Sequence, residues 1–130
     1  MKNDILLWLY AIVLSTFGAL APIHPILITV GVLVAVDTIL GVWASKKRGE
    51  RISSGRAGRV LTKMFVYEMV LVVLFMVETN VWGSWLPAVK IAAGAICVVE
   101  VISLLENSGT ILGQPVFKFL IDKLGSKSKK

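Results

Sequence analysis

The feature of this sequence that most constrains its fold is a long uncharged stretch near the start. Residues 5–36 contain no Asp, Glu, Lys or Arg. This stretch of about 32 residues is longer than the roughly 20 that one membrane-spanning helix needs. Pro22 and Pro25 lie in its middle, and proline interrupts a helix because it lacks an N–H donor and clashes with the preceding turn. We therefore predict two spans, residues 5–20 and 26–44, joined by a tight turn at the prolines.

The remaining apolar segments also belong in a bilayer. Hydrophobic residues make up 56% of the 130 residues, against roughly 45–50% in soluble domains. Two further spans are expected at residues 60–78 and 88–105, separated by a turn that contains Asn80, Gly83 and Pro87. We predict an all-α integral membrane protein, a single domain of residues 1–130 with about four transmembrane helices. A three-span alternative treats the first apolar run as re-entrant or peripheral.

The basic residues orient these spans. One cluster follows the second span in a predicted solvated loop, residues 45–59, and a second closes the chain at residues 118–130. The positive-inside rule places the loop and both termini in the cytoplasm. Although the net charge is +6, the clusters flank apolar runs, so nucleic acid is not an expected partner. The basic cytoplasmic loop and its continuation comprise Lys46, Lys47, Arg48, Arg51, Arg56, Arg59 and Lys63.

The C-terminal tail, residues 107–130, follows a predicted helix stop at residues 106–109. After Pro115, Val116, Phe119, Leu120 and Lys123 recur at helical spacing. Two interpretations remain open at this point. The segment is either a short amphipathic helix at the membrane surface or a frayed, lysine-rich solubilising tail.

Polar residues at membrane depth are the candidate functional positions. Asp37 must face protein or water because an acid in lipid costs a few kcal/mol. Gly41, four residues later, shares its helix face and would admit a neighbouring backbone. Asp37 either lies on a polar surface where helices meet or pairs with a basic residue such as Lys63. The membrane-embedded polar and oligomerisation candidates are Asp37, Gly41, Glu68, Lys90, Gly94, Glu100, Ser103 and Glu106.

The fourth span carries the deepest of these acids. Lys90, Ala93, Gly94, Cys97 and Glu100 fall along one predicted helical stripe. The sequence identifies no basic partner for Glu100, so we predict that it contributes to a polar seam between helices or protomers.

The sequence gives little support to catalysis. Its one histidine, His24, lies between two prolines, and its one cysteine, Cys97, lies inside an apolar run. No His, Cys and carboxylate residues recur with metal-ligand spacing, and no glycine-rich phosphate loop occurs. We therefore expect neither an enzyme nor a bound cofactor or metal.

Two ordered blocks of the sequence form recognisable motifs. The first block is DTILGVWA at residues 37–44, followed by Lys47, Gly49, Glu50, Ile52, Ser53 and Ser54. The second is EVISLLEN at residues 100–107, with Gly109 shortly after. Together they resemble the toxin-secretion and phage-lysis holin family, in which an aspartate followed by Gly-Val precedes a basic loop containing Ser-Ser, and a Glu-x-x-Ser-x-x-Glu-Asn-like stretch closes the last span.

This resemblance implies a small phage-encoded, multi-pass protein of the host bacterial cytoplasmic membrane. Such a protein oligomerises among membrane lipids and permeabilises the membrane, which releases or activates an endolysin and lyses the host. The family resemblance does not separate a holin from an antiholin. If this chain is a holin, an antiholin is a further candidate partner.

Two other function classes compete with this interpretation. A small four-helix proton-coupled or ion-selective transporter would also use an acid within the membrane. A membrane anchor without a pore would only dock partners through the basic loop. Coupled transport without leakage would favour the transporter, and dye release from liposomes separates the anchor from a holin.

Overall fold

The structure is a computed structural model that describes residues 2–51 and 54–127, and helices account for most of this part of the chain. The elements are α1 (Lys2–Leu20), the 3-10 turn η1 (Ala21–Ile23), α2 (His24–Lys47), α3 (Ser54–Val77), the π-helical turn η2 (Glu78–Trp82), the 3-10 turn η3 (Gly83–Trp85), α4 (Ala88–Leu112) and α5 (Val116–Lys127).

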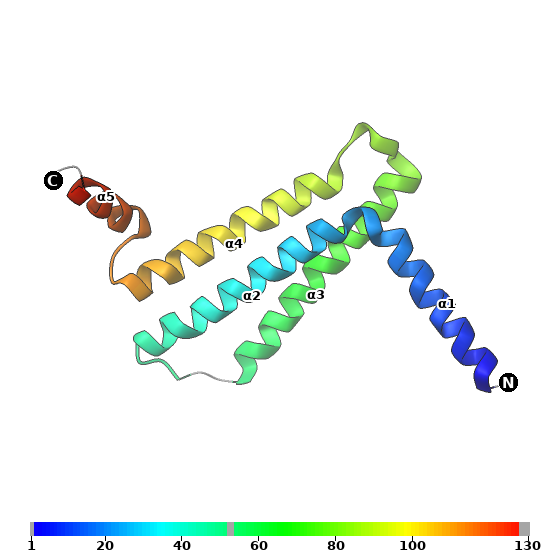
Figure 1. Ribbon diagram of the computed structural model, residues 1–130, viewed down its shortest axis with the longest axis horizontal. Helices are drawn as coiled ribbons and strands as arrows, with labels where there is room; N and C mark the ends of the chain where they lie inside the picture. The colour runs from blue at the N-terminus through cyan, green and yellow to red at the C-terminus, as the bar shows by residue number, and fades with distance from the viewer. Residues whose placement is uncertain (1, 52–53, 128–130) are drawn as a thin grey trace.

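Helices α2, α3 and α4 form a three-helix bundle. Figure 1 shows α2 and α4 running in the same direction, whereas α3 runs in the opposite direction, and α2 packs most extensively on α4. The apolar core lies toward the end of the bundle where α2 begins. Its buried members are Ile23, Val30, Leu71, Val89 and Ala93. This core is small, and most of the large apolar side chains in the described residues point outward.

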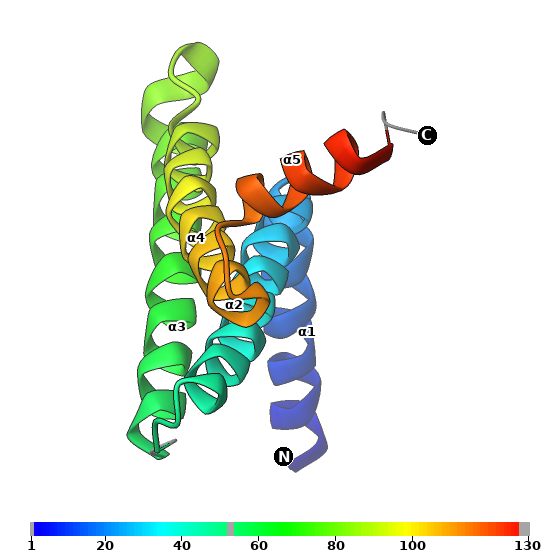
Figure 2. The same cartoon turned by 90° about the vertical axis from the view of Figure 1, so that its left-hand side faces the viewer.

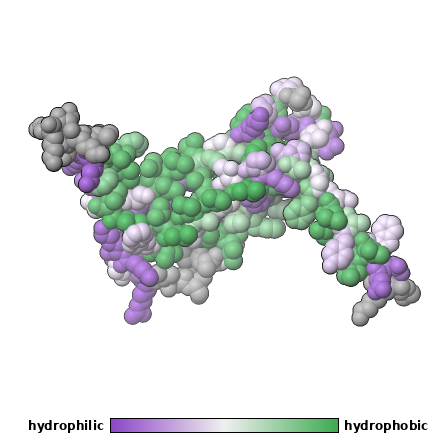
Figure 3. Space-filling view, viewed as in Figure 1, coloured by the Kyte–Doolittle hydropathy of each residue, from purple (hydrophilic) through white to green (hydrophobic). Residues whose placement is uncertain are grey.

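The outer surface matches an integral membrane protein. Three helical segments of the described chain, residues 3–47, 58–82 and 88–112, are long and apolar enough to cross a bilayer. Figure 3 shows a hydrophobic surface over the middle of the molecule, with hydrophilic residues gathered toward the ends of the helices. Since apolar side chains exposed over such an area need a non-aqueous environment, these helices belong in lipid.

The first apolar run differs from the expected pair of spans joined by a tight turn. Residues 3–47 form one long helical segment that bends at η1, and Figures 1 and 2 show α1 pointing away from the bundle. Pro22 and Pro25 lie at the starts of η1 and α2, positions where a missing N–H breaks no helical hydrogen bond. The prolines therefore bend the chain at η1, and the four-span count remains a prediction.

The basic connection is shorter than the predicted loop of residues 45–59. Helix α2 continues through Lys47 and α3 begins at Ser54. Gly49 adopts a positive φ of 74° at the turn. Beside it the Arg48 guanidinium donates to Glu50 at 2.6 Å, which raises the pKa of Arg48. Ile52, Ser53 and the side chain of Arg56 lie outside the described residues.

The predicted helix stop at residues 106–109 was also wrong. Helix α4 continues to Leu112 and ends at Gly113, which has a left-handed φ of 73°. The Gln114 N–H then donates to the Gly109 carbonyl at 3.2 Å. After Pro115, the predicted amphipathic segment forms helix α5, so the described part of the tail is helical.

Candidate functional site

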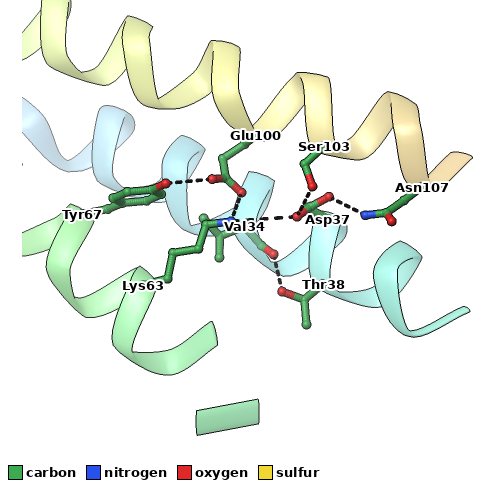
Figure 4. Close-up of polar contacts among 8 residues, drawn as sticks. All are labelled: Val34, Asp37, Thr38, Lys63, Tyr67, Glu100, Ser103 and Asn107. Carbon is green, nitrogen blue, oxygen red and sulfur yellow. Dashed lines mark hydrogen bonds and ion pairs between the residues drawn. The ribbon is translucent and has the colours of Figure 1, made fainter. Parts of the chain in front are cut away.

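A cluster of polar side chains lies between the three helices of the bundle. Figure 4 shows that α2, α3 and α4 all contribute to it. We call it the polar cluster. Its members are Asp37 from α2, Lys63 and Tyr67 from α3, and Glu100, Ser103 and Asn107 from α4.

Glu100 is completely buried within this cluster, with 0% of its surface exposed. The Lys63 ammonium lies 2.7 Å from Glu100 Oε2, and the Tyr67 hydroxyl donates to Oε1 at 3.0 Å. Both carboxylate oxygens therefore have a partner from α3. The polar seam predicted at Glu100 lies between helices of one chain, and its basic partner is Lys63.

Asp37 is held mainly by α4. Ser103 Oγ donates to Oδ2 at 3.0 Å, and Asn107 Nδ2 donates to Oδ1 at 2.9 Å. Lys63 Nζ lies 3.9 Å from Oδ2. The structure therefore contains the alternative Asp37–Lys63 pair, but this contact is longer than the one between Lys63 and Glu100. One ammonium thus bridges two buried carboxylates from different helices (Figure 4).

Helical spacing explains why these side chains meet. Glu100, Ser103 and Asn107 fall three and four residues apart on α4, and Lys63 and Tyr67 fall four apart on α3, so each set lies on one face. The i, i+4 spacing of a lysine and a tyrosine was a signal in the sequence for this site. The sequence does not show which face of α3 meets α4, because that depends on how the helices pack.

The cluster lies within the three segments that are apolar enough to cross a bilayer. Asp37 precedes Lys47, the last residue of α2, by ten positions, which corresponds to about 15 Å along a helix. A polar group at such depth is costly unless it is hydrogen-bonded. In the part of the chain that the structure describes, every buried side-chain nitrogen and oxygen has a hydrogen-bond partner. The carboxylates of Asp37 and Glu100 are therefore buried with their partners, whereas the Lys63 side chain is 35% exposed.

Two glycines of α2 allow polar side chains of the neighbouring helices to approach. A Cβ atom at Gly41 would lie 3.4 Å from Asn107 Nδ2, and one at Gly31 would lie 3.6 Å from Glu68 Oε1. The neighbour at Gly41 is thus a side chain of α4 and not the backbone that was predicted. Glu68, by contrast, packs against α2 outside the polar cluster.

The other predicted positions are not part of the cluster. Lys90, Gly94 and Glu106 are exposed, so their predicted role in oligomerisation remains a prediction. The stripe predicted along α4 is divided, because Ala93 and Glu100 are buried in the bundle whereas Lys90 and Gly94 face outward.

Polar contacts also fix both ends of α4, and the sequence did not reveal them. At its start, the Val89 N–H donates to Glu78 Oε2 at 2.9 Å, which caps the helix. At its end, the Lys47 ammonium donates to the Ile111 carbonyl oxygen. A cation at this position also complements the negative end of the helix dipole. One residue of the predicted basic loop thus holds α2 and α4 together.

A groove of about 230 Å³ lies beside the cluster, on the side of the basic connection. Asp37, Ser45, Arg48, Lys63 and Asn107 are among the residues that line it. The lining is mixed, with Val42 and Val60 beside these polar residues, and the polar part gives water a route toward Asp37. Among the described residues, no group of three or more His, Cys, Asp or Glu side chains is placed to hold a metal ion.

Comparison with known proteins gives one match. Neither the curated proteins nor the solved structures include a significant match to this chain. A family model described as the bacteriophage holin family matches residues 12–127, which include the second half of α1, the polar cluster and α5. The chain therefore belongs to the bacteriophage holin family.

Proposed function

We propose that this protein is a holin that oligomerises in the cytoplasmic membrane of the host bacterium and permeabilises it. The lesions release or activate an endolysin, which then degrades the cell wall. Family membership supports this role. The observation that carries the proposed mechanism is the polar cluster, which is enclosed by three helices whose outer surfaces are apolar.

The enclosed cluster explains how the protein accumulates without leakage. Lys63 and the two carboxylates are satisfied within one chain, and both carboxylates are buried, so a single bundle needs no partner chain to hold these charges. In a lesion, the helices separate and the same side chains line water. Hydration then replaces the contacts that they lose. Triggering is a shift between these two assemblies as the protein concentration in the membrane rises.

We further propose that α1 crosses the bilayer, which gives four spans with both termini in the cytoplasm. A helix of 19 residues is about 29 Å long and matches a hydrocarbon core of about 30 Å. Residues 3–19 are exposed on every side of α1. A helix lying on the membrane surface needs a polar face, which these side chains do not form. The Thr16 hydroxyl donates to the Ile12 carbonyl at 2.8 Å and adds no unsatisfied group in lipid.

Inducible expression in bacteria tests the proposed function. We expect abrupt growth arrest together with loss of membrane potential, measured with a potential-sensitive dye. The combined variant Asp37→Asn and Glu100→Gln preserves side-chain volume but removes two charges that a lesion would hydrate, so its lysis time should change. Asp122→Asn is the matched control, because Asp122 is an exposed acid outside the polar cluster and outside the predicted oligomerisation positions.

Two results would contradict the proposal. Steady growth at high membrane levels of the protein would exclude permeabilisation, and an unchanged lysis time for the double variant would exclude the role of the cluster. Purified protein in dye-loaded liposomes separates a pore from an anchor, since only a pore releases the dye. Coupled substrate movement in liposomes that stay tight would indicate a transporter instead.

A further inference from the structure

Helix α5 carries an exposed apolar stripe that the proposed lysis mechanism does not use. Phe117, Leu120 and Ile121 are 69%, 48% and 68% exposed, and they lie three and four residues apart on one face. Val116 and Phe119, on the adjacent face, are partly buried. Leu120 and Ile121 therefore point away from the rest of the chain, whereas Phe117 also borders the cavity between α4 and α5.

Lysines border this stripe on both sides. Since each helical residue advances by about 100°, Lys118 lies about 60° beyond Ile121 and Lys123 lies about 60° before Leu120. The Lys123 ammonium is 5.9 Å from the centre of the Phe119 ring. Asp122 lies on the side of the helix away from the stripe. This arrangement, an apolar centre with flanking cations, is typical of helices at the interface of an anionic membrane.

The connection to α4 gives α5 a defined position. The left-handed Gly113, the hydrogen bond from Gln114 to Gly109 and the helix-breaking Pro115 fix the turn, and α5 runs across the direction of α4 in Figures 1 and 2. This turn lies at the end of the bundle that carries Lys47, because the Lys47 ammonium reaches Ile111. The start of α5 thus lies at the same end of the bundle as the basic connection, where a leaflet surface would lie.

We propose that α5 lies along this leaflet and binds anionic phospholipid, with its stripe among the upper acyl chains and its lysines at the headgroups. The alternative occupant is a second copy of this chain. Three apolar side chains are too few for the roughly 800 Å² per partner of a stable protein interface. Lysines on both flanks would also repel the same lysines of another α5. Charge and area therefore both favour lipid.

The cavity between α4 and α5 does not provide the headgroup site. It measures about 630 Å³, and Glu106 is among its lining residues together with Leu105, Gly109 and Phe117. An acid there disfavours an anionic group. The headgroups therefore bind along the lysine flanks of α5, outside this cavity.

Site-specific fluorescence on the full-length protein in vesicles tests this proposal. In a Cys97→Ser background, a polarity-sensitive dye is attached at Ile121→Cys on the stripe or at Asp122→Cys on the opposite side. The vesicles contain phosphatidylcholine with or without phosphatidylglycerol, and carry a quencher at a shallow acyl position. We expect blue-shifted, quenched emission at position 121, stronger with phosphatidylglycerol, and a water-like signal at position 122.

The lysines provide the second measurement. Each should contribute about fivefold to the surface-bound population of α5 in anionic vesicles. Lys118→Gln combined with Lys123→Gln should therefore remove the dependence on phosphatidylglycerol. Lys90→Gln is the control, because Lys90 is an exposed lysine near the opposite end of the bundle. Circular dichroism verifies that each variant retains its helices.

Three results would overturn the proposal. Equal signals at positions 121 and 122 would show that α5 has no oriented contact with lipid. A blue shift that disappears when the protein is diluted in lipid would identify a second copy as the occupant. Unchanged dependence on phosphatidylglycerol in the double lysine variant would show that the lysines do not bind headgroups. None of these measurements involves lysis, so they are independent of the proposed holin activity.

Discussion

Helices α1 and α2 are neighbours in the chain and both are strongly apolar, yet only α2 packs into the bundle. Residues 3–19 of α1 are all exposed, whereas α2 buries Val30, Val34, Asp37, Ala44 and Ser45. The difference lies in the small and polar residues. In a bilayer, apolar side chains gain little by leaving lipid for another helix, so close approach and hydrogen bonding decide which helices associate. Helix α2 provides both, through its glycines and Asp37.

The largest effect should come from removing the shared cation of the polar cluster. Lys63→Met leaves Asp37 and Glu100 without their ammonium partner. Leaving a buried charge without its ion-pair partner costs about 3–5 kcal/mol. Because Lys63 belongs to α3 and its shortest contact is to Glu100 of α4, the packing of α3 on the other two helices should weaken. The free energy of unfolding in detergent measures this loss. Lys90→Met, at an exposed lysine, should change it by less than about 0.5 kcal/mol, and an equal loss there would contradict the role of the cluster.

A matched pair of leucines compares packed and unpacked helices directly. Leu71 in α3 is completely buried and Leu14 in α1 is 70% exposed. Leu71→Ala should lower the free energy of unfolding by roughly 2–5 kcal/mol because it leaves a cavity. Leu14→Ala should change it by less than about 0.5 kcal/mol. If the two variants unfolded alike, α1 would be packed on the bundle in the membrane.

A second pair tests the close approach of α4 to α2. A side chain at Gly41 would meet the Asn107 amide, whereas a Cβ atom at Gly94 would have nothing within 4 Å. Gly41→Val should cost roughly 1–3 kcal/mol through overpacking and displace Asn107 from Asp37. Gly94→Val should not lower the free energy of unfolding. Denaturant titrations of both variants measure this difference. Similar losses for both variants would exclude a specific role for Gly41.

The smallest expected effect concerns the turn between α3 and α4. Glu78→Ala removes the acceptor for the Val89 N–H, and the loss of a helix cap costs about 1 kcal/mol. The exchange rate of the Val89 amide hydrogen should rise accordingly. Glu106→Ala, at an exposed acid within α4, is the control. Unchanged exchange at Val89 would show that Glu78 does not cap the helix in the membrane.

The helix ends show where the sequence was misleading. Asn107 and Ser108 follow an apolar run and were interpreted as a helix stop, but both lie inside α4. The Asn107 amide binds Asp37 across the bundle, so a residue with weak helix propensity contributes a tertiary contact instead of a stop. The same holds for Ser45, which was assigned to a solvated loop and is 1% exposed in α2.

The sequence by itself determined that this protein is helical and belongs in a membrane, because hydropathy is a local property that adds up along each segment. It also identified Asp37, Gly41, Glu100 and Ser103 as candidate positions, since polar residues at membrane depth need partners. Only the tertiary structure decided which partners these are. Lys63 and Glu100 are 37 positions apart, and their contact depends on which faces of α3 and α4 meet. That choice follows from the packing of whole helices, which no local pattern contains.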